Sequence, residues 1–316
     1  MRILVTAIGG DIGYGIGKIL RKAGIAEYLV GCDVHREHAG RFYFDHCDVV
    51  ARADSSDYVA SLLRVARANR VDLIIPTSEP ELRYLLASNT LTDLEGVPLL
   101  LANQQSLRAG FDKLQTAALL RQAGLPFPWT GLVGHGPPQA LPCIIKERFG
   151  AGSRGLSIVD KDLVPLYMRT RGADIWQELL RPADQEHTCG VYRTEDGEIR
   201  TIVFRRKLVA GVTTYGTVVR NNAQIEQLLF RLAEVLELRG SINVQLMLTD
   251  SGPKVFEINP RFSSTVVFRH LMGFQDALWS IAERLGGAVP PYEPPQDGSA
   301  FYRGVDELML APGAPT

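Results

Sequence analysis

The chain has 316 residues, of which 46% are hydrophobic and 22% charged, a composition typical of folded globular proteins. Its 34 Lys and Arg residues nearly balance its 35 Asp and Glu residues, so bulk charge gives no attraction for nucleic acid. No apolar run approaches the roughly 20 residues of a membrane span, and the N-terminus lacks the pattern of a signal peptide. We therefore expect a soluble cytoplasmic protein of about two domains that acts on small molecules, with no nucleic-acid or membrane partner; a homodimer is left open.

The first hundred residues alternate strand-like and helix-like patterns. Segments with helical periodicity separate four apolar runs typical of buried strands, at 2–7, 28–34, 72–77 and 97–102. This alternation predicts the α/β fold class with a doubly wound parallel sheet. Ligands of such sheets bind at the carboxyl ends of the strands, where this chain carries a glycine-rich turn, Asp33 and the turn 76–79.

Glycine is frequent just after the first of these runs, at positions 9, 10, 13, 15 and 17. Together with Asp33, about 20 residues beyond Gly13, these glycines imitate the fingerprint of a dinucleotide-binding turn. The spacing G-x-G-x-G departs from that fingerprint, and we interpret the segment as a tight turn that leads into a helix. A dehydrogenase that binds NAD(P) at this turn is the alternative hypothesis.

The four cysteines lie far apart without a C-x-x-C pair, as expected of reduced thiols. A zinc site could use the spacing of five residues, Cys32, His35, His38, His46 and Cys47. Because structural zinc sites usually show closer ligand pairs, we interpret these residues as ordinary loop side chains.

A different pattern begins near residue 104. An amphipathic helix is predicted over 111–125, and after a proline cluster the chain turns repeatedly between short strand-like runs, as antiparallel hairpins do. A second strong helix is predicted over 225–238, and the tail is rich in proline. We expect domains at 1–103 and 104–288, followed by a proline-rich C-terminal tail at 289–316.

The clearest hairpin of the chain lies at 241–260. If its strands pair symmetrically about Ser251, Gln245 faces Glu257 and Asn243 faces Asn259. Facing residues have Cβ atoms about 5 Å apart, so each pair would bring its polar groups together.

Alternation of side chains groups the polar residues of this hairpin on one face. Gln245, Glu257 and Asn259 project together, and the opposite face takes the apolar side chains of Leu246, Phe256 and Ile258. One carboxylate with two amide oxygens suits Mg²⁺, which takes its other ligands from water and phosphates. Arg261 follows directly and could contact the same phosphates in bidentate fashion. An ordinary polar face of a hairpin is the alternative interpretation.

A lysine precedes a glycine-rich loop in the segment IIKERFGAGSRG. Lys146 lies in a predicted strand, and Gly150, Gly152 and Ser153 follow in the loop. A fixed ammonium group beside many free backbone N–H groups is an arrangement that wraps polyphosphate. Because the lysine comes before the glycines, the segment is not a Walker loop. A plain hairpin turn is the alternative.

The order of these motifs resembles the ATP-grasp superfamily, and in particular one ATP-binding half of the carbamoyl phosphate synthetase large subunit. The resemblance covers roughly residues 1–290, and its most specific part is the sequence E-x-N-P-R at 257–261 together with Gln245. It implies that the N-terminal α/β unit is a pre-ATP-grasp domain and that two α+β lobes of an ATP-grasp domain hold ATP between them.

The resemblance also implies roles for individual residues, with ATP and Mg²⁺ as cofactors. The lysines and the glycine loop would contact the phosphates, the segment 177–180 adenine, and Glu186 the ribose. The implied nucleotide-binding residues are Lys113, Lys146, Gly150, Gly152, Ser153, Gln177, Glu178, Leu179, Leu180 and Glu186. Gln245, Glu257 and Asn259 would hold Mg²⁺, and Arg261 and Lys146 would act on the γ-phosphate as catalytic residues.

The chain departs from carbamoyl phosphate synthetases in ways that change the expected reaction. Residues 262–265, Phe-Ser-Ser-Thr, lack the second arginine that helps to hold bicarbonate in those enzymes, and the chain has one ATP unit and no glutaminase part. We expect instead an ADP-forming carboxylate-amine ligase, which activates an acid as an acyl phosphate and joins it to an amine or a similar nucleophile. A nucleotide-binding regulator without turnover is a further alternative.

The sequence gives less information about the substrates than about the nucleotide. Candidate contacts are Ser78, Glu79, Arg269 and His270; Arg269 could hold a carboxylate and Glu79 an ammonium group. For each of these residues a structural ion pair or a helix cap is the alternative interpretation.

Overall fold

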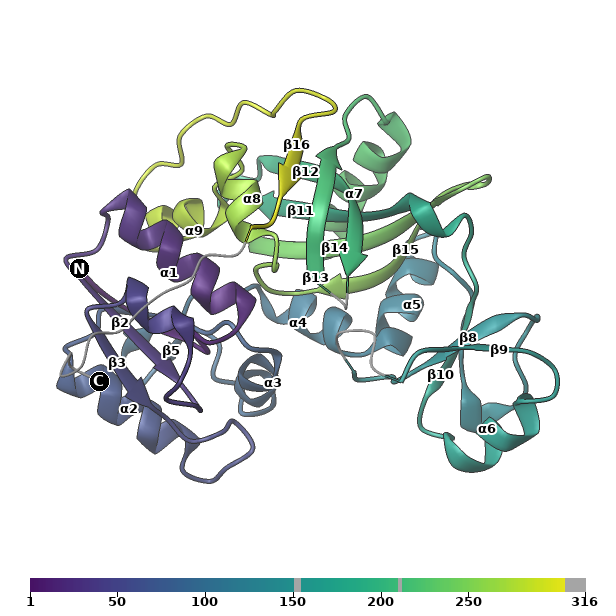
Figure 1. The fold of residues 1–316 in the computed structure, drawn as a ribbon, viewed down its shortest axis with the longest axis horizontal. Helices are drawn as coiled ribbons and strands as arrows, with labels where there is room; N and C mark the ends of the chain where they lie inside the picture. The colour runs from purple at the N-terminus through teal and green to yellow at the C-terminus, as the bar shows by residue number, and fades with distance from the viewer. Residues whose placement is uncertain (151–154, 210–211, 305–316) are drawn as a thin grey trace.

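The computed structural model describes residues 1–150, 155–209 and 212–304 (Figure 1). The N-terminal third is built around a four-stranded sheet with the order β3-β2-β1-β4, in which every neighbouring pair is parallel. This arrangement confirms the predicted α/β class. The elements of this third are β1 (Arg2–Thr6), α1 (Asp11–Ala23), β2 (Tyr28–Asp33), η1 (Ala39–Tyr43), β3 (His46–Val49), α2 (Tyr58–Ala68), β4 (Leu73–Ile75), α3 (Glu79–Ala87), β5 (Asp93–Leu94) and β6 (Val97–Pro98).

Helices cover both faces of this sheet, which is why its strands are apolar on both sides. Ile3 and Val5 of β1 pack in the same core as α1, whereas Leu4 packs in the core that contains α2. Two elements differ from the sequence prediction. β3, with the polar sequence HCDV, lies at an edge and carried no apolar pattern. Of the run 97–102, only Val97–Pro98 forms a strand, and Leu99 adds an isolated parallel bridge to Ile74.

The helix predicted over 111–125 forms as α5 (Lys113–Gln122), and a further helix, α4 (Gln104–Phe111), precedes it. Asp112 has an extended backbone, with φ of −128°, and its carboxylate accepts a hydrogen bond from the Leu114 N–H at 2.9 Å. It therefore ends α4 and caps α5.

A small antiparallel sheet with the order β7-β10-β8-β9 follows, with α6 packed on it (Figure 1). Its apolar core contains Cys143, Ile145 and Trp176. The elements are β7 (Thr130–Leu132), η2 (Val133–His135), β8 (Cys143–Lys146), β9 (Ser157–Val159), α6 (Val164–Thr170), β10 (Ile175–Glu178) and η3 (Ala183–Gln185).

The largest sheet has six strands in the order β15-β14-β11-β12-β13-β16. Residues of α7, such as Leu229 and Leu232, share a core with Val191 and Val244 of the sheet. The elements are β11 (Glu186–Arg193), β12 (Ile199–Val209), β13 (Val212–Val218), α7 (Ala223–Val235), β14 (Gly240–Thr249), β15 (Gly252–Asn259), α8 (Val266–Leu271), α9 (Asp276–Arg284) and β16 (Ala300–Tyr302).

Helices α8 and α9 join this sheet to the N-terminal third. Val266 and Ala277 pack in the core of the parallel sheet, while Phe268 and Trp279 pack against the large sheet. The proline-rich segment after α9 ends in β16, which pairs with β13 at the edge of the large sheet. None of the helices in the described part of the chain is long and apolar enough to cross a membrane.

Candidate active site

The hairpin predicted at 241–260 forms as β14 and β15. Gln245 pairs with Glu257 and Asn243 pairs with Asn259, as predicted. Asn259 and Asn243 are 7% and 3% exposed, so these polar side chains face the protein interior or a cavity rather than open solvent. The alternative of an ordinary solvent-exposed polar face therefore does not fit this hairpin.

The register near the turn is different from the prediction. Thr249 pairs with Gly252, which makes the turn one residue shorter than symmetry about Ser251 requires. The register then shifts between Gln245 and Leu246, where a bulge in β15 adds one residue. The shorter turn and the bulge compensate each other, so the facing pairs at the site are still those predicted.

The bulge residue is Phe256, and the prediction that it projects to the same face as Leu246 and Ile258 is wrong. Val255 occupies the core position beside Leu246 and Ile258. The centroid of the Phe256 ring lies 5.6 Å from Nζ of Lys146. An ammonium group over an aromatic face is attracted by the ring quadrupole, so Phe256 helps to hold this lysine in place.

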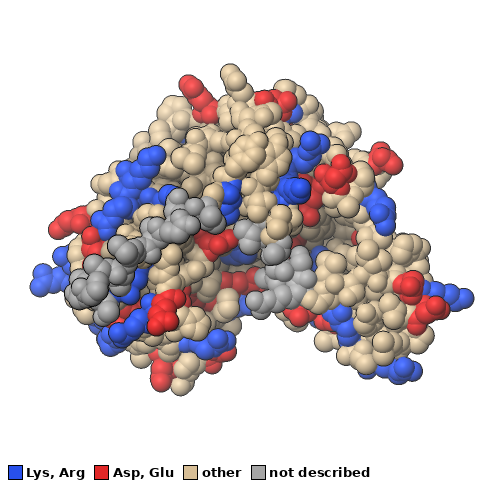
Figure 2. All heavy atoms as spheres, viewed as in Figure 1, with Lys and Arg blue, Asp and Glu red and all other residues tan. Residues whose placement is uncertain are grey.

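A cavity of about 340 Å³ opens beside the hairpin. We call it the reaction cavity; its walls come from the turn after β1, the start of α3, β12, the hairpin and the segment after β15. The predicted site residues that line it are Ser78, Glu79, Gln245, Glu257, Asn259 and Arg261. In the space-filling view the surface is hollowed between the two ends of the molecule, and basic and acidic side chains both appear there (Figure 2).

Glu257 presents a free carboxylate to this cavity. It forms no hydrogen bond or ion pair with any residue that the structure describes. The amide oxygens beside it face cations: Oε1 of Gln245 accepts from Arg206 at 3.2 Å, and Oδ1 of Asn259 accepts from Arg261 at 3.4 Å. One free carboxylate, two amide oxygens and nearby guanidinium groups fit Mg²⁺ bound together with a polyphosphate, since Mg²⁺ takes few protein ligands.

The two predicted phosphate-binding lysines converge on this region. Lys113 begins α5, and its Nζ donates to the backbone carbonyl of Gly150 at 2.5 Å. Lys146 ends β8 and is 7% exposed. Burial lowers the pKa of Lys146 to about 8; the Glu257 carboxylate raises this pKa, and the Lys113 ammonium lowers it. The two ammonium groups lie near the carboxylates of Glu257 and Glu186, and Glu186 is already paired with Arg206, so positive charge is left for phosphate oxygens.

The glycine loop is described as far as Gly150, and the predicted contacts Gly152 and Ser153 lie outside the described residues. Its start is fastened to the helical region: the Phe149 carbonyl accepts from Arg83 at 2.9 Å, and Arg148 forms a bidentate pair with Asp112. These contacts hold in place the chain segments next to Lys113 and Lys146.

The predicted adenine-binding segment follows the last strand of the small sheet. Gln177 is 3% exposed and donates from Nε2 to Oγ1 of Thr130 at 3.0 Å. Its side chain therefore links neighbouring strands of the small sheet. Glu178 is ion-paired with Lys254 of β15, with Nζ 2.7 Å from Oε1. The next two residues, Leu179 and Leu180, are half-buried, and their backbone groups form no hydrogen bond with the described residues. Backbone groups of this kind can pair with a planar heterocycle.

Glu186 is engaged by an arginine that the sequence analysis missed. Arg206 of β12 donates from Nη2 to Oε1 of Glu186 at 2.6 Å and also reaches Gln245. Its side chain is 8% exposed and lines the reaction cavity. A signal was available, because symmetric pairing of β11 and β12 about Asp196 places position 206 opposite Glu186, and the observed register does so.

Arg261 lies near carboxylates on two walls of the reaction cavity, Glu257 of the hairpin and Glu79 at the start of α3. Burial lowers the pKa of its guanidinium, and the carboxylates of Glu79 and Glu257 both oppose this shift. Glu79 also accepts from Arg83 at 2.6 Å. Ser78 caps α3, and its Oγ donates to Glu81 at 2.6 Å, so the alternative of a helix cap holds for Ser78 although it also lines the cavity.

The other two substrate candidates do not line the reaction cavity. Arg269 is 0% exposed; it contacts the amide oxygen of Asn243 and forms an ion pair with the equally buried Asp276. His270 is half-buried, and burial lowers the pKa of its imidazole, with Lys22 of α1 adding to this effect. The expectation that Arg269 holds a substrate carboxylate is corrected to a structural ion pair, because α8 turns that side chain into the interior.

The glycine turn after β1 forms part of the reaction cavity. A Cβ on Gly13 would lie 2.4 Å from the carbonyl oxygen of Ala7, so only glycine fits there. Asp33 closes the turn: its two carboxylate oxygens accept from the N–H groups of Gly9 at 2.9 Å and His35 at 3.0 Å. In the part of the chain that the structure describes, no group of three or more Cys, His, Asp or Glu residues is placed to hold a metal ion.

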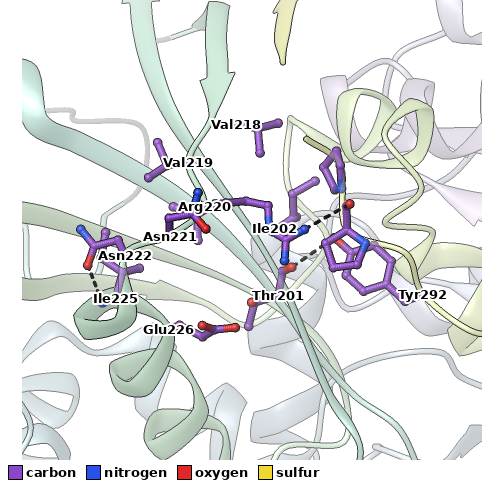
Figure 3. Close-up of a pocket in the computed structure, with 13 residues that line it drawn as sticks. Thr201, Ile202, Val218, Val219, Arg220, Asn221, Asn222, Ile225, Glu226 and Tyr292 are labelled. Atoms are coloured by element: carbon purple, nitrogen blue, oxygen red, sulfur yellow. Dashed lines mark hydrogen bonds between the residues drawn. The ribbon is translucent and has the colours of Figure 1, made fainter. Parts of the chain in front are cut away.

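A separate cavity of about 130 Å³ lies away from these residues (Figure 3). Its walls include Arg220, Glu226 and Tyr292. The guanidinium of Arg220 donates to the carbonyl of Pro294 at 3.3 Å, and the hydroxyl of Tyr292 donates to the carbonyl of Thr201 at 3.1 Å. These bonds fasten the proline-rich segment to the large sheet, so the polar groups of this cavity have a structural role.

A parallel four-stranded sheet followed by a small and a large antiparallel sheet, with the reaction cavity between the parallel sheet and the large one, is an ATP-grasp-like fold. Residues 178–305 match a family model described as "ATP-grasp in the biosynthetic pathway with Ter operon". This match and the fold support the predicted resemblance to the ATP-grasp superfamily.

Solved structures with this fold cover most of the chain. The N5-carboxyaminoimidazole synthetase from Staphylococcus aureus is 16% identical, with a TM-score of 0.72 over 92% of this chain and 78% of that one. The N5-carboxyaminoimidazole ribonucleotide synthetase from Thermus thermophilus is 17% identical, with a TM-score of 0.72 and coverages of 95% and 81%. The biotin carboxylase from Campylobacter jejuni is 13% identical, with a TM-score of 0.70 and coverages of 92% and 72%.

Proposed function

We propose that this chain is an ATP-dependent ligase that activates a carboxylate as an acyl phosphate and joins it to an amine or a similar nucleophile. The observation that carries the proposal is the free Glu257 carboxylate, which faces a cavity with two amide side chains and with Arg206 and Arg261. Mg²⁺ bound at Glu257, Gln245 and Asn259 would neutralise charge on the ATP phosphates.

The reaction divides into two displacements. A carboxylate oxygen of the acid forms a bond to the γ-phosphorus while the bond to the ADP oxygen breaks, which gives an acyl phosphate and ADP. The amine nitrogen then bonds to the acyl carbon, the carbon–oxygen bond to phosphate breaks, and the amine proton passes to phosphate or solvent. The protein mainly orients two anions and offsets their repulsion, for which Lys113, Lys146 and Arg261 are placed.

The substrates enter from the N-terminal side of the reaction cavity in this proposal. Glu79 lies near Arg261 there, so a carboxylate and a guanidinium are available to an ammonium group and an acid respectively. Ser78 and the backbone of the glycine turn complete that wall.

Two alternatives predict different results. A nicotinamide dehydrogenase would use the glycine turn, but that turn shares its cavity with the Glu257 hairpin. A regulator without turnover would bind MgATP and release no ADP.

The proposal is tested by measuring ADP release with MgATP across a panel of carboxylates and amines. We expect release to need a particular acid, and hydroxylamine to trap the activated acid as a hydroxamate without the amine. MgATP binding with no ADP release from any acid would favour the regulator. Stabilisation by NAD(P) and not by MgATP in a thermal shift assay would favour the dehydrogenase.

A further inference from the structure

A second cavity, of about 300 Å³, adjoins the reaction cavity at the carboxyl edge of the parallel sheet. We call it the edge pocket; its walls include Ala7, Asp33, Val34, Ala53, Ser78 and Glu81. Ala7 and Ser78 line both cavities, so the two cavities are neighbours there. Its volume is at the lower end of the range for ligand pockets, which suits a group of nucleoside size and not a complete dinucleotide.

The place of the edge pocket in the sheet is one where ligands bind. With the order β3-β2-β1-β4, the chain adds strands on one side of β1 and then crosses to the other side. Open α/β sheets bind ligands outside the carboxyl ends of the strands at such a reversal. The pocket is lined by residues that follow β1, β3 and β4 and by Asp33 at the end of β2.

The walls select against anions and favour a hydrogen-bond donor. Val34, Val50, Ala51 and Ala53 supply apolar surface. Arg52 stands at the rim, but it is ion-paired with Asp54, and both side chains are 71% exposed. The interior therefore offers acceptors and apolar contacts without a free cation among the residues described there.

Asp33 is the carboxylate of the edge pocket that is oriented to accept further hydrogen bonds. Its residue is 8% exposed, and each of its carboxylate oxygens accepts one backbone N–H, from Gly9 and His35. These bonds fix the carboxylate plane and leave a lone pair on each oxygen. Two adjacent hydroxyl groups can donate to one such carboxylate, and an acid at the end of the second strand has this role toward a ribose in related sheets. Glu81, by contrast, already accepts from Thr6, Tyr58 and Ser78.

We propose that the edge pocket binds a nucleoside-like group, a flat heterocycle that carries a vicinal diol, with the diol on Asp33 and the ring against the apolar wall of Val34 and Ala53. Because the pocket adjoins the reaction cavity at Ala7 and Ser78, we take the group to be the remote part of one reactant, whose reacting end lies near Glu79 and Arg261. This last step rests on the proposed ligase function, whereas binding in the pocket does not.

The probe is adenosine, measured by saturation-transfer NMR with the ATP site filled by Mg²⁺ and a non-hydrolysable ATP analogue. Val34 and Val49 offer a matched pair of variants, because both are 38% exposed and only Val34 lines the pocket. We expect Val34→Trp to weaken adenosine binding at least tenfold and Val49→Trp to leave it unchanged, with the affinity for the ATP analogue equal in both. Loss of the diol in 2′,3′-dideoxyadenosine should weaken binding by about 10-fold or more, the usual effect of removing hydrogen bonds to a charged group.

Equal binding of adenosine and its dideoxy analogue, or equal binding by the two tryptophan variants, would overturn the assignment. So would NAD⁺ that binds more tightly than adenosine, which would instead favour a dinucleotide site. The measurement needs no turnover, so adenosine binding in the expected pattern without ADP release would contradict the ligase and leave the edge pocket standing. ADP release with no adenosine binding would support the ligase and contradict the assignment of the edge pocket.

Discussion

Lys146 should make ATP binding depend on pH between 7 and 9. Burial lowers the pKa of this side chain from its ordinary value of 10.5 to about 8. At pH 7 about nine-tenths of the molecules then carry the charged ammonium, and at pH 9 about one-tenth do. Phosphate oxygens pair with the charged form, so ATP binding above pH 8 must take up a proton.

The magnitude follows from the protonated fraction. If ATP selects the charged form, the association constant falls about tenfold from pH 7 to pH 9, or about 1.4 kcal/mol, and binding at pH 8 takes up about half a proton. The effect of this residue on folding has the opposite sign. Between pH 8 and 10.5 the unfolded chain binds more protons at position 146 than the native one, so the destabilising contribution of buried Lys146 is full below pH 8 and disappears as the pH rises to 10.5.

Calorimetric titration of MgATP in two buffers with different ionisation enthalpies measures this proton uptake directly. Lys146→Arg keeps the charge at every pH and should bind ATP with little change between pH 7 and 9. Lys113→Arg is the control and should keep the wild-type proton uptake. Wild-type binding without proton uptake at pH 8, or uptake that persists in Lys146→Arg, would refute this reasoning.

Two further variants test residues whose roles depend on the fold. Arg206→Ala removes a cation that faces the reaction cavity and frees the Glu186 carboxylate, so kcat should fall by roughly 10- to 100-fold; Arg206→Lys should fall less, and equal rates for wild type and Arg206→Ala in steady-state assays would exclude this role. Arg269→Ala leaves Asp276 buried without its cation and should lower the free energy of unfolding by about 3–5 kcal/mol in urea titrations; wild-type stability with a raised KM for the acid would restore Arg269 as a substrate contact.

The predictable part of the site came from local patterns. Strand alternation and a turn near Ser251 predict Gln245 opposite Glu257, although this agreement also depends on a bulge that offsets the shorter turn. A lysine before glycines marks Lys146. The bulge at Phe256 was not predictable, because no residue type requires a bulge and its effect on register was hidden by the shorter turn.

Contacts between elements distant in sequence were harder to find. Lys254 reaches Glu178 across two different sheets, which no local pattern encodes. The helix that contains Arg269 was expected, but which side of α8 faces the interior is decided by its packing between the parallel sheet and the large sheet. For the same reason the edge pocket, which combines turns that follow four strands, appears only in three dimensions.

The central claim is that the β14–β15 hairpin holds the divalent ion that accompanies ATP, and Glu257→Gln tests it most directly. We predict that wild type binds ATP at least tenfold more tightly with Mg²⁺ than with EDTA in calorimetric titrations, and that Glu257→Gln loses this difference while its unfolding temperature is unchanged. Glu226→Gln alters an exposed carboxylate in the separate cavity lined by Arg220 and Tyr292, and this variant should behave as wild type. A Glu257→Gln variant that keeps the full effect of Mg²⁺ on ATP binding would contradict the account.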